Sequence, residues 1–228
     1  PMPREKKRKS PEVGYQPKKR QPKTNFQRKN TETKTSRNRI LIVCEDSLSS
    51  PHYFDAMIRD YNLSGTDIRI YGEGGSAPSS VYSDAERIYR EDAEKYGEDN
   101  TYDKVYCVFD KDQHADYDDT IEKCKQSTKI DAITSVPCFE VWLLFHFIDS
   151  EKPLENGETA TKKLKEHIKK YDKANLINTY HDQLKNKTNT AIKNSESVMK
   201  RVTKAETDNP SSHIHILVKH LQKEAKKV

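Results

Sequence analysis

Two carboxylates follow an apolar run in the middle of the chain. Residues 105–109 are Val-Tyr-Cys-Val-Phe, and Asp110 and Asp112 come just after them. A run without polar alternation is typical of a strand buried on both faces, as in a parallel sheet covered by helices. Ligands of such sheets bind beyond the carboxyl ends of the strands. The pair therefore stands where carboxylate oxygens can hold a hard cation such as Mg²⁺, although turns after strands also favour aspartate.

A third acid occupies the same kind of position earlier in the chain. Glu45 follows the apolar run 40–44, and the ends of two parallel strands can be neighbours at one edge of a crevice. The three carboxylates would then converge and bind Mg²⁺ or Mn²⁺, which at a phosphodiester activates water and stabilises the charge that develops on phosphate. His114 is a candidate to protonate a leaving oxygen or to orient water. Lys111 is a candidate to hold phosphate, unless it simply faces solvent.

The elements that must position these residues alternate between strand and helix. We expect strands at residues 39–45, 66–71, 103–110 and 130–135, and helices at 49–61, 79–96 and 117–127. This alternation predicts an α/β fold with a mostly parallel, doubly wound sheet flanked by helices. After about residue 158 the pattern is helical, with helices expected at 159–170, 173–186, 188–206 and 211–227. We therefore divide the chain into a tail (1–38), an α/β domain (39–150) and a C-terminal helical region packed on it (151–228).

The most hydrophobic segment, 137–147, contains two polar residues that need an explanation. It is expected to be a helix packed deep on the sheet. A buried carboxylate is costly unless it is paired or binds a metal, so Glu140 is either a further metal ligand or a satisfied structural residue. His146 is expected to be a core histidine with a backbone partner. His213 and His215 are two residues apart, which on a helix separates them by about 200° and argues against a metal pair.

Charge is distributed unevenly along the 228 residues. Residues 1–39 carry 14 Lys+Arg and 3 acidic residues, a net charge of +11, whereas the remainder carries 27 Lys+Arg and 33 acidic residues, a net charge of −6. A segment this charged and this poor in apolar residues is expected to be disordered in isolation. Basic arms bind phosphate backbones through counterion release, which makes Lys18, Lys19 and Arg20 candidate nucleic-acid contacts. A solubilising tail and a membrane-surface contact are the alternatives.

Composition and spacing exclude several other classes of protein. No apolar stretch reaches the roughly 20 residues of a membrane span, and the basic opening residues lack the apolar core of a secretory signal. The four cysteines lie far apart without a CxxC pair, which predicts buried, reduced thiols in a cytoplasmic protein rather than a zinc site. The glycine cluster at 72–78 lacks the GxGxxG and P-loop patterns, so it is either a phosphate-facing loop or a flexible turn.

Several segments resemble the RloB-like family, over about residues 38–225. The segments are Cys44-Glu45, Pro51-x-Tyr53-Phe54, Val108-Phe109-Asp110-Lys111-Asp112-Gln113-His114, Ser135-x-Pro137-Cys138-Phe139-Glu140-x-Trp142-Leu143-Leu144-x-His146-Phe147, and Asn209-Pro210-Ser211-Ser212-x-x-His215-x-Leu217-Val218. The resemblance implies a TOPRIM-type, Rossmann-like fold and a place in bacterial restriction or phage-defence loci. It also implies Glu45 as the general acid or base, with Asp110 and Asp112 as the metal-binding pair.

Three positions depart from the family pattern. Asp46 stands where the family has glycine, Ser50 replaces a second glutamate, and Val136 replaces asparagine. Loss of the acid at position 50 removes an expected metal ligand, for which Asp46 is a nearby substitute. A weakened or differently metallated site is therefore an alternative to a fully active one.

Two hypotheses for the function follow from this site. The first is a metal-dependent nuclease of anti-phage defence that hydrolyses DNA or RNA. Because a cell must restrain such an enzyme, we expect a defence-system partner or an infection-derived activator. The second is a nucleic-acid-binding or sensor module whose site no longer cleaves. A haloacid-dehalogenase-type phosphatase is disfavoured, because in those enzymes the two aspartates follow the first strand and not the third. The sequence leaves open whether the protein forms a homo-oligomer.

Overall fold

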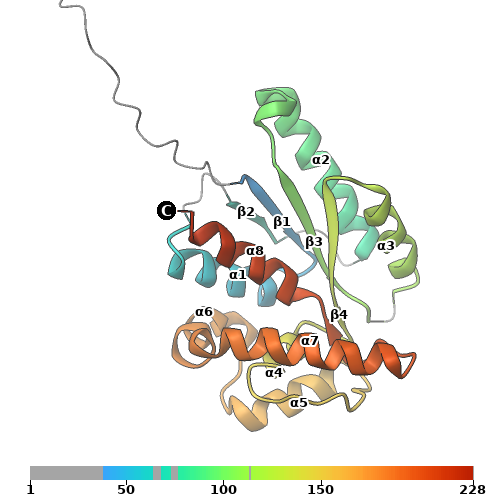
Figure 1. Ribbon diagram of the computed structural model, residues 1–228, viewed down its shortest axis with the longest axis vertical. Coiled ribbons are helices and arrows are strands. Elements are labelled where there is room, and N and C mark those ends of the chain that lie inside the picture. The colour runs from blue at the N-terminus through green and yellow to red at the C-terminus, as the bar shows by residue number, and fades with distance from the viewer. Residues whose placement is uncertain (1–37, 64–67, 73–76, 113, 228) are drawn as a thin grey trace, which may run out of the picture. The chain divides into compact units, whose positions relative to one another are not determined.

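A five-stranded sheet in the order β2-β1-β3-β4-β5 organises the chain (Figure 1). The computed structural model describes residues 38–63, 68–72, 77–112 and 114–227, all of which belong to one compact unit. Strands β1 to β4 are parallel, and β5 pairs antiparallel with β4. The strands are β1 (Ile40–Cys44), β2 (Ile68–Tyr71), β3 (Lys104–Asp110), β4 (Ile130–Val136) and β5 (Ser211–Ser212).

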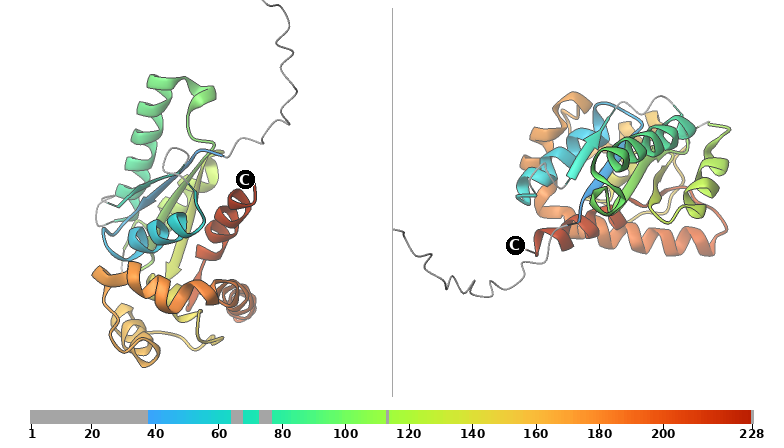
Figure 2. Two further views of the ribbon diagram at one scale, coloured as in Figure 1. Left: turned by 90° about the vertical axis from the view of Figure 1, so that its left-hand side faces the viewer. Right: turned by 90° about the horizontal axis from the view of Figure 1, so that it is seen from above.

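Both faces of the sheet are buried, which explains the continuous apolar runs of β1 and β3. In β1, Ile40 and Ile42 belong to one hydrophobic core, and Leu41 and Val43 belong to another. Helices α1 (Ser49–Asp60) and α8 (Ile214–Ala225) cover the first face, and α2 (Pro78–Tyr96) and α3 (Tyr117–Gln126) cover the second (Figure 2). The predicted α/β, Rossmann-like architecture with a mostly parallel sheet is confirmed.

The part of the chain after β4 packs beyond the carboxyl ends of the strands (Figure 1). Its helices are α4 (Glu140–Leu144), α5 (Gly157–His167), α6 (Leu176–Thr179) and α7 (Thr188–Lys204). It also contains short turns of other helix types, namely η2 (Lys173–Asn175), η3 (Tyr180–Leu184) and η4 (Lys185–Lys187). A similar short turn, η1 (Glu98–Asn100), lies earlier in the chain between α2 and β3. This part also contributes β5 and α8 to the sheet and its first face. None of the described helices has both the length and the apolar character needed to cross a bilayer.

Three local expectations differ from the structure. The helix expected over 137–147 is only the five-residue α4, because a segment buried on every side gives no periodicity from which its conformation can be read. The helix expected at 173–186 is broken into η2, α6 and η3. The helix expected at 211–227 begins only at Ile214, because Ser211 and Ser212 form β5, where the Ser212 hydroxyl lies 3.0 Å from that of Ser135 on β4.

The core below the sheet is aromatic and holds His146 in its neutral form. The Tyr53 ring meets those of Trp142, Phe139 and Tyr180 edge to face. His146 Nδ1 lies 3.1 Å from the Trp142 carbonyl, which can only accept, so Nδ1 carries the proton. His146 Nε2 then accepts from the Tyr53 hydroxyl at 3.3 Å. The expectation of a core histidine with a backbone partner is confirmed.

Protonation of His146 is expected to weaken the fold in acid. Burial lowers the pKa of His146 from its ordinary 6.5 to about 4. The folded protein thus binds this proton less readily than the unfolded chain. The contribution of His146 to the free energy of unfolding is therefore complete above pH 6.5 and is lost as the pH falls towards 4. At about 1.4 kcal/mol per pKa unit, the loss is on the order of 3 kcal/mol.

Urea unfolding across that pH range would measure the effect as a slope of unfolding free energy against pH. A His146→Gln variant should show a flatter slope than the wild type. His181→Gln, at an exposed histidine, is the control and should keep the wild-type slope. Equal slopes in all three proteins would show that His146 does not carry the effect.

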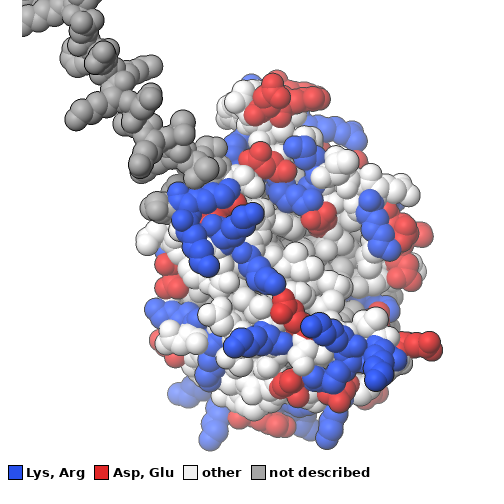
Figure 3. All heavy atoms as spheres, in the orientation of Figure 1, with Lys and Arg blue, Asp and Glu red and all other residues white. Residues whose placement is uncertain are grey.

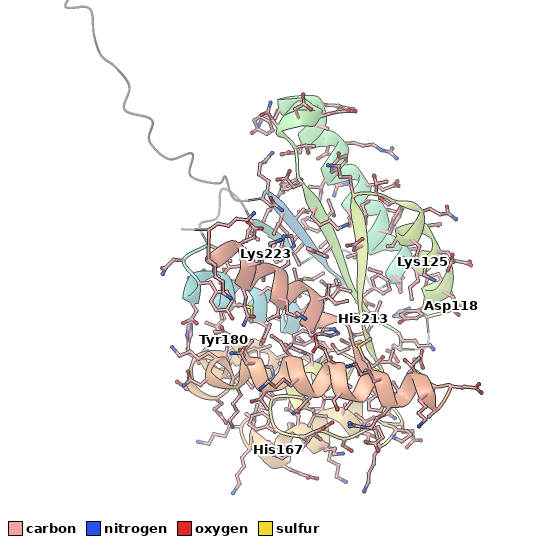
Figure 4. The ribbon with its side chains drawn as sticks, in the orientation of Figure 1. Asp118, Lys125, His167, Tyr180, His213 and Lys223 are labelled. Carbon is pink, nitrogen blue, oxygen red and sulfur yellow. The ribbon has the colours of Figure 1, made fainter. Side chains whose placement is uncertain are left out.

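The cysteines are buried thiols, as the sequence predicts, and His213 and His215 each have a hydrogen-bond partner. The four cysteines are free and buried. His213 lies where β5 leads into α8 (Figure 4), and its Nδ1 is 2.9 Å from the Thr134 hydroxyl. His215 Nδ1 instead lies 3.1 Å from the Ser195 hydroxyl. The two histidines therefore have separate hydrogen-bond partners.

Candidate functional site

The ends of β1 and β3 bring Glu45 and Asp110 together. The two strands are hydrogen-bonded neighbours in parallel register, with Cys44 beside Val108, and the Glu45 N–H donates to the Val108 carbonyl at 3.0 Å. Glu45 Oε2 accepts a hydrogen bond from the Asp110 N–H, also at 3.0 Å. The strand adjacency that the sequence predicted is therefore present, and it places the two acids at one edge of the sheet.

His114 faces the other oxygen of the same carboxylate. Its Nε2 lies 3.1 Å from Glu45 Oε1, and both side chains are largely shielded, with 27% and 17% of their surface exposed. Glu45 thus has one oxygen on a backbone N–H and one on an imidazole. A carboxylate and an imidazole at this distance can share and transfer a proton, which is the behaviour expected of an acid–base pair.

Asp112 lies in the turn after β3 with an unusual backbone conformation. Its φ is +30°, in the left-handed region that aspartate tolerates better than most residues. Its N–H donates to the Pro137 carbonyl at 3.3 Å, and the residue is exposed. Its charge nevertheless reaches the site, because Asp112 is among the groups that raise the pKa of Glu45.

Three carboxylates line a single cavity at this edge. The cavity has a volume of ≈ 270 Å³ and is lined by Glu45, Asp46, Ser50, Val108, Phe109, Asp110 and Phe139. Burial, with the charges of Glu140 and Glu45, raises the pKa of Asp110 well above its ordinary value. Burial also raises the pKa of Glu45, against the opposing effects of the Asp110 N–H and His114. The charged forms of Glu45 and Asp110 are thus disfavoured by burial and by neighbouring negative charges. A cation in the cavity would stabilise these charged forms.

Glu140 approaches the site from behind Asp110. Its side chain is 2% exposed, and Lys173 Nζ lies 3.0 Å from its Oε1. The Tyr171 hydroxyl donates to the same oxygen at 3.0 Å. The structure therefore gives Glu140 the protein partners of a satisfied buried acid. Tyr171 and Lys173 lie more than 30 residues further along the chain, and no sequence pattern marks them as neighbours of the site.

Asp46 accepts hydrogen bonds from residues at the start of helix α1. Its Oδ1 accepts from the backbone N–H of Leu48, at 2.8 Å, and from that of Ser49. Its Oδ2 lies 2.8 Å from the Ser50 hydroxyl and accepts the Ser50 N–H at 3.3 Å. This is the capping arrangement that aspartate makes at a helix start. Asp46 also brings a carboxylate beside Ser50.

The asparagine and alanine variants of Asp46 separate its charge from its capping role. Asp46→Asn keeps an acceptor for the α1 N–H groups and should unfold at the wild-type temperature. Asp46→Ala should lose about 1 kcal/mol of stability, which lowers Tm by roughly 2–4 °C in a chain of this size. Thermal unfolding by circular dichroism measures both, with Ser47→Ala at an exposed neighbour as control. A loss in the asparagine variant equal to that in the alanine variant would contradict the capping role.

The predicted basic contacts have different outcomes. Lys111 forms an ion pair with Asp208, in the segment between α7 and β5, and its Nζ lies 5.5 Å from the centre of the Tyr117 ring. Lys18, Lys19 and Arg20 lie outside the described residues. The glycine cluster is described only at its ends, where a side chain at Gly72 would come within 2.7 Å of Pro51.

The residues fit a divalent cation by their chemistry, although they do not form a closed set of ligands. Mg²⁺ and Mn²⁺ take oxygen ligands, often one or two carboxylates completed by water and substrate phosphate. Glu45 and Asp110 supply such oxygens at the cavity. Within the described part of the chain, however, no three His, Cys, Asp or Glu side chains are grouped as a preformed metal site.

The comparison with protein-family models covers most of the chain. Residues 40–221 match the model of the RloB-like protein family. The chain belongs to the RloB-like protein family. No curated protein and no solved structure matches it significantly. The matched region runs from the first residue of β1 into α8, so the RloB-like match includes the sheet, the acid cavity and the helices beyond it.

Proposed function

We propose that this RloB-like protein is a divalent-metal-dependent nuclease of the TOPRIM type, which hydrolyses phosphodiester bonds of DNA or RNA. The observation that carries the proposal is the meeting of Glu45 and Asp110, from the ends of adjacent parallel strands, at one acid-lined cavity. Raised pKa values of both carboxylates support it, because perturbed acids in a cleft are typical of functional sites. The family resemblance supports the same choice of residues.

Each residue has a distinct part in the proposed reaction. Mg²⁺ or Mn²⁺, when bound, supplies stabilisation of the charge on the phosphate and an activated water. Asp110, Glu45 and Asp112 would hold the ion, with Glu140 shaping the charge around Asp110 from behind. The Glu45–His114 pair would hold a proton between Oε1 and Nε2 and deliver it to the leaving oxygen.

Two lysines would favour binding of the negatively charged substrate. Lys173 neutralises Glu140 and so limits the negative charge that an incoming phosphate meets. Burial lowers the pKa of Lys173, but the Glu140 carboxylate overcomes this and raises it overall, so Lys173 stays charged. Lys111 would leave Asp208 and contact a phosphate, because both partners are substantially exposed and an exposed ion pair is worth little.

Cleavage of a mixed panel of nucleic acids tests the proposal. Supercoiled plasmid, linear duplex, single strands and total tRNA would each be incubated with the full chain and Mg²⁺, Mn²⁺ or EDTA. We expect cleavage of at least one substrate that requires metal and stops in EDTA. Absence of metal-dependent cleavage from every substrate, with a correctly folded protein, would contradict the nuclease.

A second candidate function is a nucleic-acid-binding or sensor module that does not cleave. Two observations favour it: both oxygens of Glu45 already have protein partners, and no preformed metal group is found among the described residues. Binding of one panel substrate without turnover would select it. Ser50→Glu, which restores the acid of the family pattern, would then be expected to bring back metal-dependent cleavage.

A role in anti-phage defence inside the bacterial cytoplasm completes the proposal. The family resemblance supports the defence role, and the four free cysteines are consistent with a reducing compartment. A partner would restrain the nuclease, or an infection-derived trigger would activate it. Plating of phages on bacteria that express the protein or its Asp110→Ala variant tests this, and equal plaque counts for a broad phage panel would argue against a defence role.

A further inference from the structure

Six exposed lysines form two stripes along the last two long helices. Those on α7 are Lys193, Lys200 and Lys204, and those on α8 and at its C-terminal cap are Lys219, Lys223 and Lys226. The spacings of seven and four residues on α7, and of four and three on α8, keep each stripe on one side of its helix. We call these six residues the basic face.

The two stripes face the same side of the molecule. Lys219 Nζ lies 2.7 Å from Glu196 Oε1 on α7, and the Gln222 side chain donates to Asn189 at 3.2 Å. These contacts pair the start of α7 with the end of α8, so the helices run antiparallel. Figure 3 shows Lys and Arg side chains along α8 and across α7 on this side, and Figure 4 places Lys223 on α8.

Each end of the basic face lies close to an identifiable segment of the chain. At one end, the N–H of Asn38 donates to Glu224 Oε2 at 3.0 Å, near the end of α8. Asn38, the first described residue, is therefore held at α8 by Glu224, which follows Lys223 in the sequence. At the other end, Lys204 closes α7 four residues before Asp208, which pairs with Lys111 beside Asp110. The basic face thus reaches Asn38 at one end and, through Lys204, the segment whose Asp208 pairs with Lys111 at the other.

We infer that the basic face is the docking surface for the phosphate backbone of a nucleic acid and leads it to the acid cavity. This inference rests on the proposed function and identifies where its substrate binds. The body after residue 39 has a net charge of −6 and would repel a polyanion without such a concentrated surface. An anionic membrane fits less well, because among the described large hydrophobic side chains only Leu48, Tyr96 and Ile216 are exposed, and Ile216 alone lies on α8.

A charge-neutralised variant of the full chain tests the inference. The variant carries Lys219→Gln, Lys223→Gln and Lys226→Gln. Its control, Lys95→Gln with Lys123→Gln and Lys125→Gln, removes the same charge from exposed positions on α2 and α3, the helices that cover the opposite sheet face. Labelled single-stranded DNA, duplex DNA and RNA would be titrated at several salt concentrations in EDTA, so that binding is measured without cleavage.

The basic-face variant should have an affinity for nucleic acid that is lower by on the order of tenfold or more. The slope of its log affinity against log salt concentration should be smaller in magnitude by about 2–3 than that of the wild type. The control should keep the wild-type slope. A wild-type slope in the basic-face variant, or no binding by the wild type, would overturn the inference. Unchanged nucleic-acid binding together with lost binding to phosphatidylserine vesicles would overturn it in favour of a membrane.

The inference and the proposed function can fail separately. If the wild type binds through the basic face but no metal supports cleavage, the docking surface stands and the nuclease fails. If the wild type cleaves and the basic-face variant binds and cleaves equally well, the nuclease stands and the docking surface fails. Thermal unfolding midpoints should differ by no more than about 2 °C between variants, because all six substitutions are on the surface.

Discussion

Replacing Asp110 by asparagine is expected to abolish metal-dependent cleavage while the protein remains folded. A bound divalent ion supplies several kcal/mol of stabilisation to the charge that develops on phosphate. Because each 1.4 kcal/mol is about tenfold in rate, loss of the ion should reduce cleavage on the order of 10³-fold. The substituted amide would keep the shape of the side chain but lose the charge that holds the cation.

The same substitution should not cost stability. Burial and the neighbouring acids Glu140 and Glu45 raise the pKa of Asp110, so the folded state disfavours its charged form. For an acid of this kind the unfavourable contribution is present at neutral pH and disappears as the pH falls to the ordinary value near 4. Asp110→Asn should therefore be at least as stable as the wild type at neutral pH, and the difference should vanish in acid.

Initial cleavage rates and urea unfolding curves measure the two expectations on one protein preparation. Asp119→Asn, at an exposed position on α3, is the matched control and should change neither rate nor stability. Glu45→Gln should resemble Asp110→Asn in rate. Cleavage by Asp110→Asn at more than a tenth of the wild-type rate would remove Asp110 from the metal site.

Trp142→Ala is expected to be the most destabilising single substitution at the core beneath the site. Trp142 is completely buried, and its ring meets Tyr53 and His146 edge to face. Truncation of a buried tryptophan loses the transfer free energy of the side chain and leaves a cavity, which together cost about 3–5 kcal/mol. Tm should fall by roughly 6–20 °C, given 2–4 °C per kcal/mol in a chain of this length.

Circular dichroism is the appropriate measurement, because Trp142 is the only tryptophan and its removal eliminates the fluorescence signal. Trp142→Phe should lose much less, since a ring still fills most of the space. Tyr96→Ala, at a tyrosine that is 50% exposed, is the surface control and should stay within about 0.5 kcal/mol of the wild type. A loss below about 1 kcal/mol in Trp142→Ala, far short of the usual range for a buried tryptophan, would show that the aromatic core is not the main support of this region.

Strand and helix positions were predictable because their signals are local. The apolar runs before Glu45 and Asp110 identify strands buried on both faces, and hydrophobic periodicity identifies α1 and α2. Because the ends of neighbouring parallel strands share one edge, the meeting of Glu45 with Asp110 follows from the order of these elements. His114 could be placed near them because it lies only four residues after Asp110.

Contacts between residues far apart in the chain were decided by tertiary structure. Lys173 and Tyr171 reach Glu140 because α4 and η2 pack together beyond the sheet, and Asp208 reaches Lys111 because the segment after α7 returns to β4. A polar side chain on a solvated helix has the same local pattern whether or not a distant acid faces it. The sequence by itself therefore indicated strands β1 to β4 and placed Glu45 and Asp110 at strand ends, whereas only packing decided the antiparallel β5 and which charges surround the two acids.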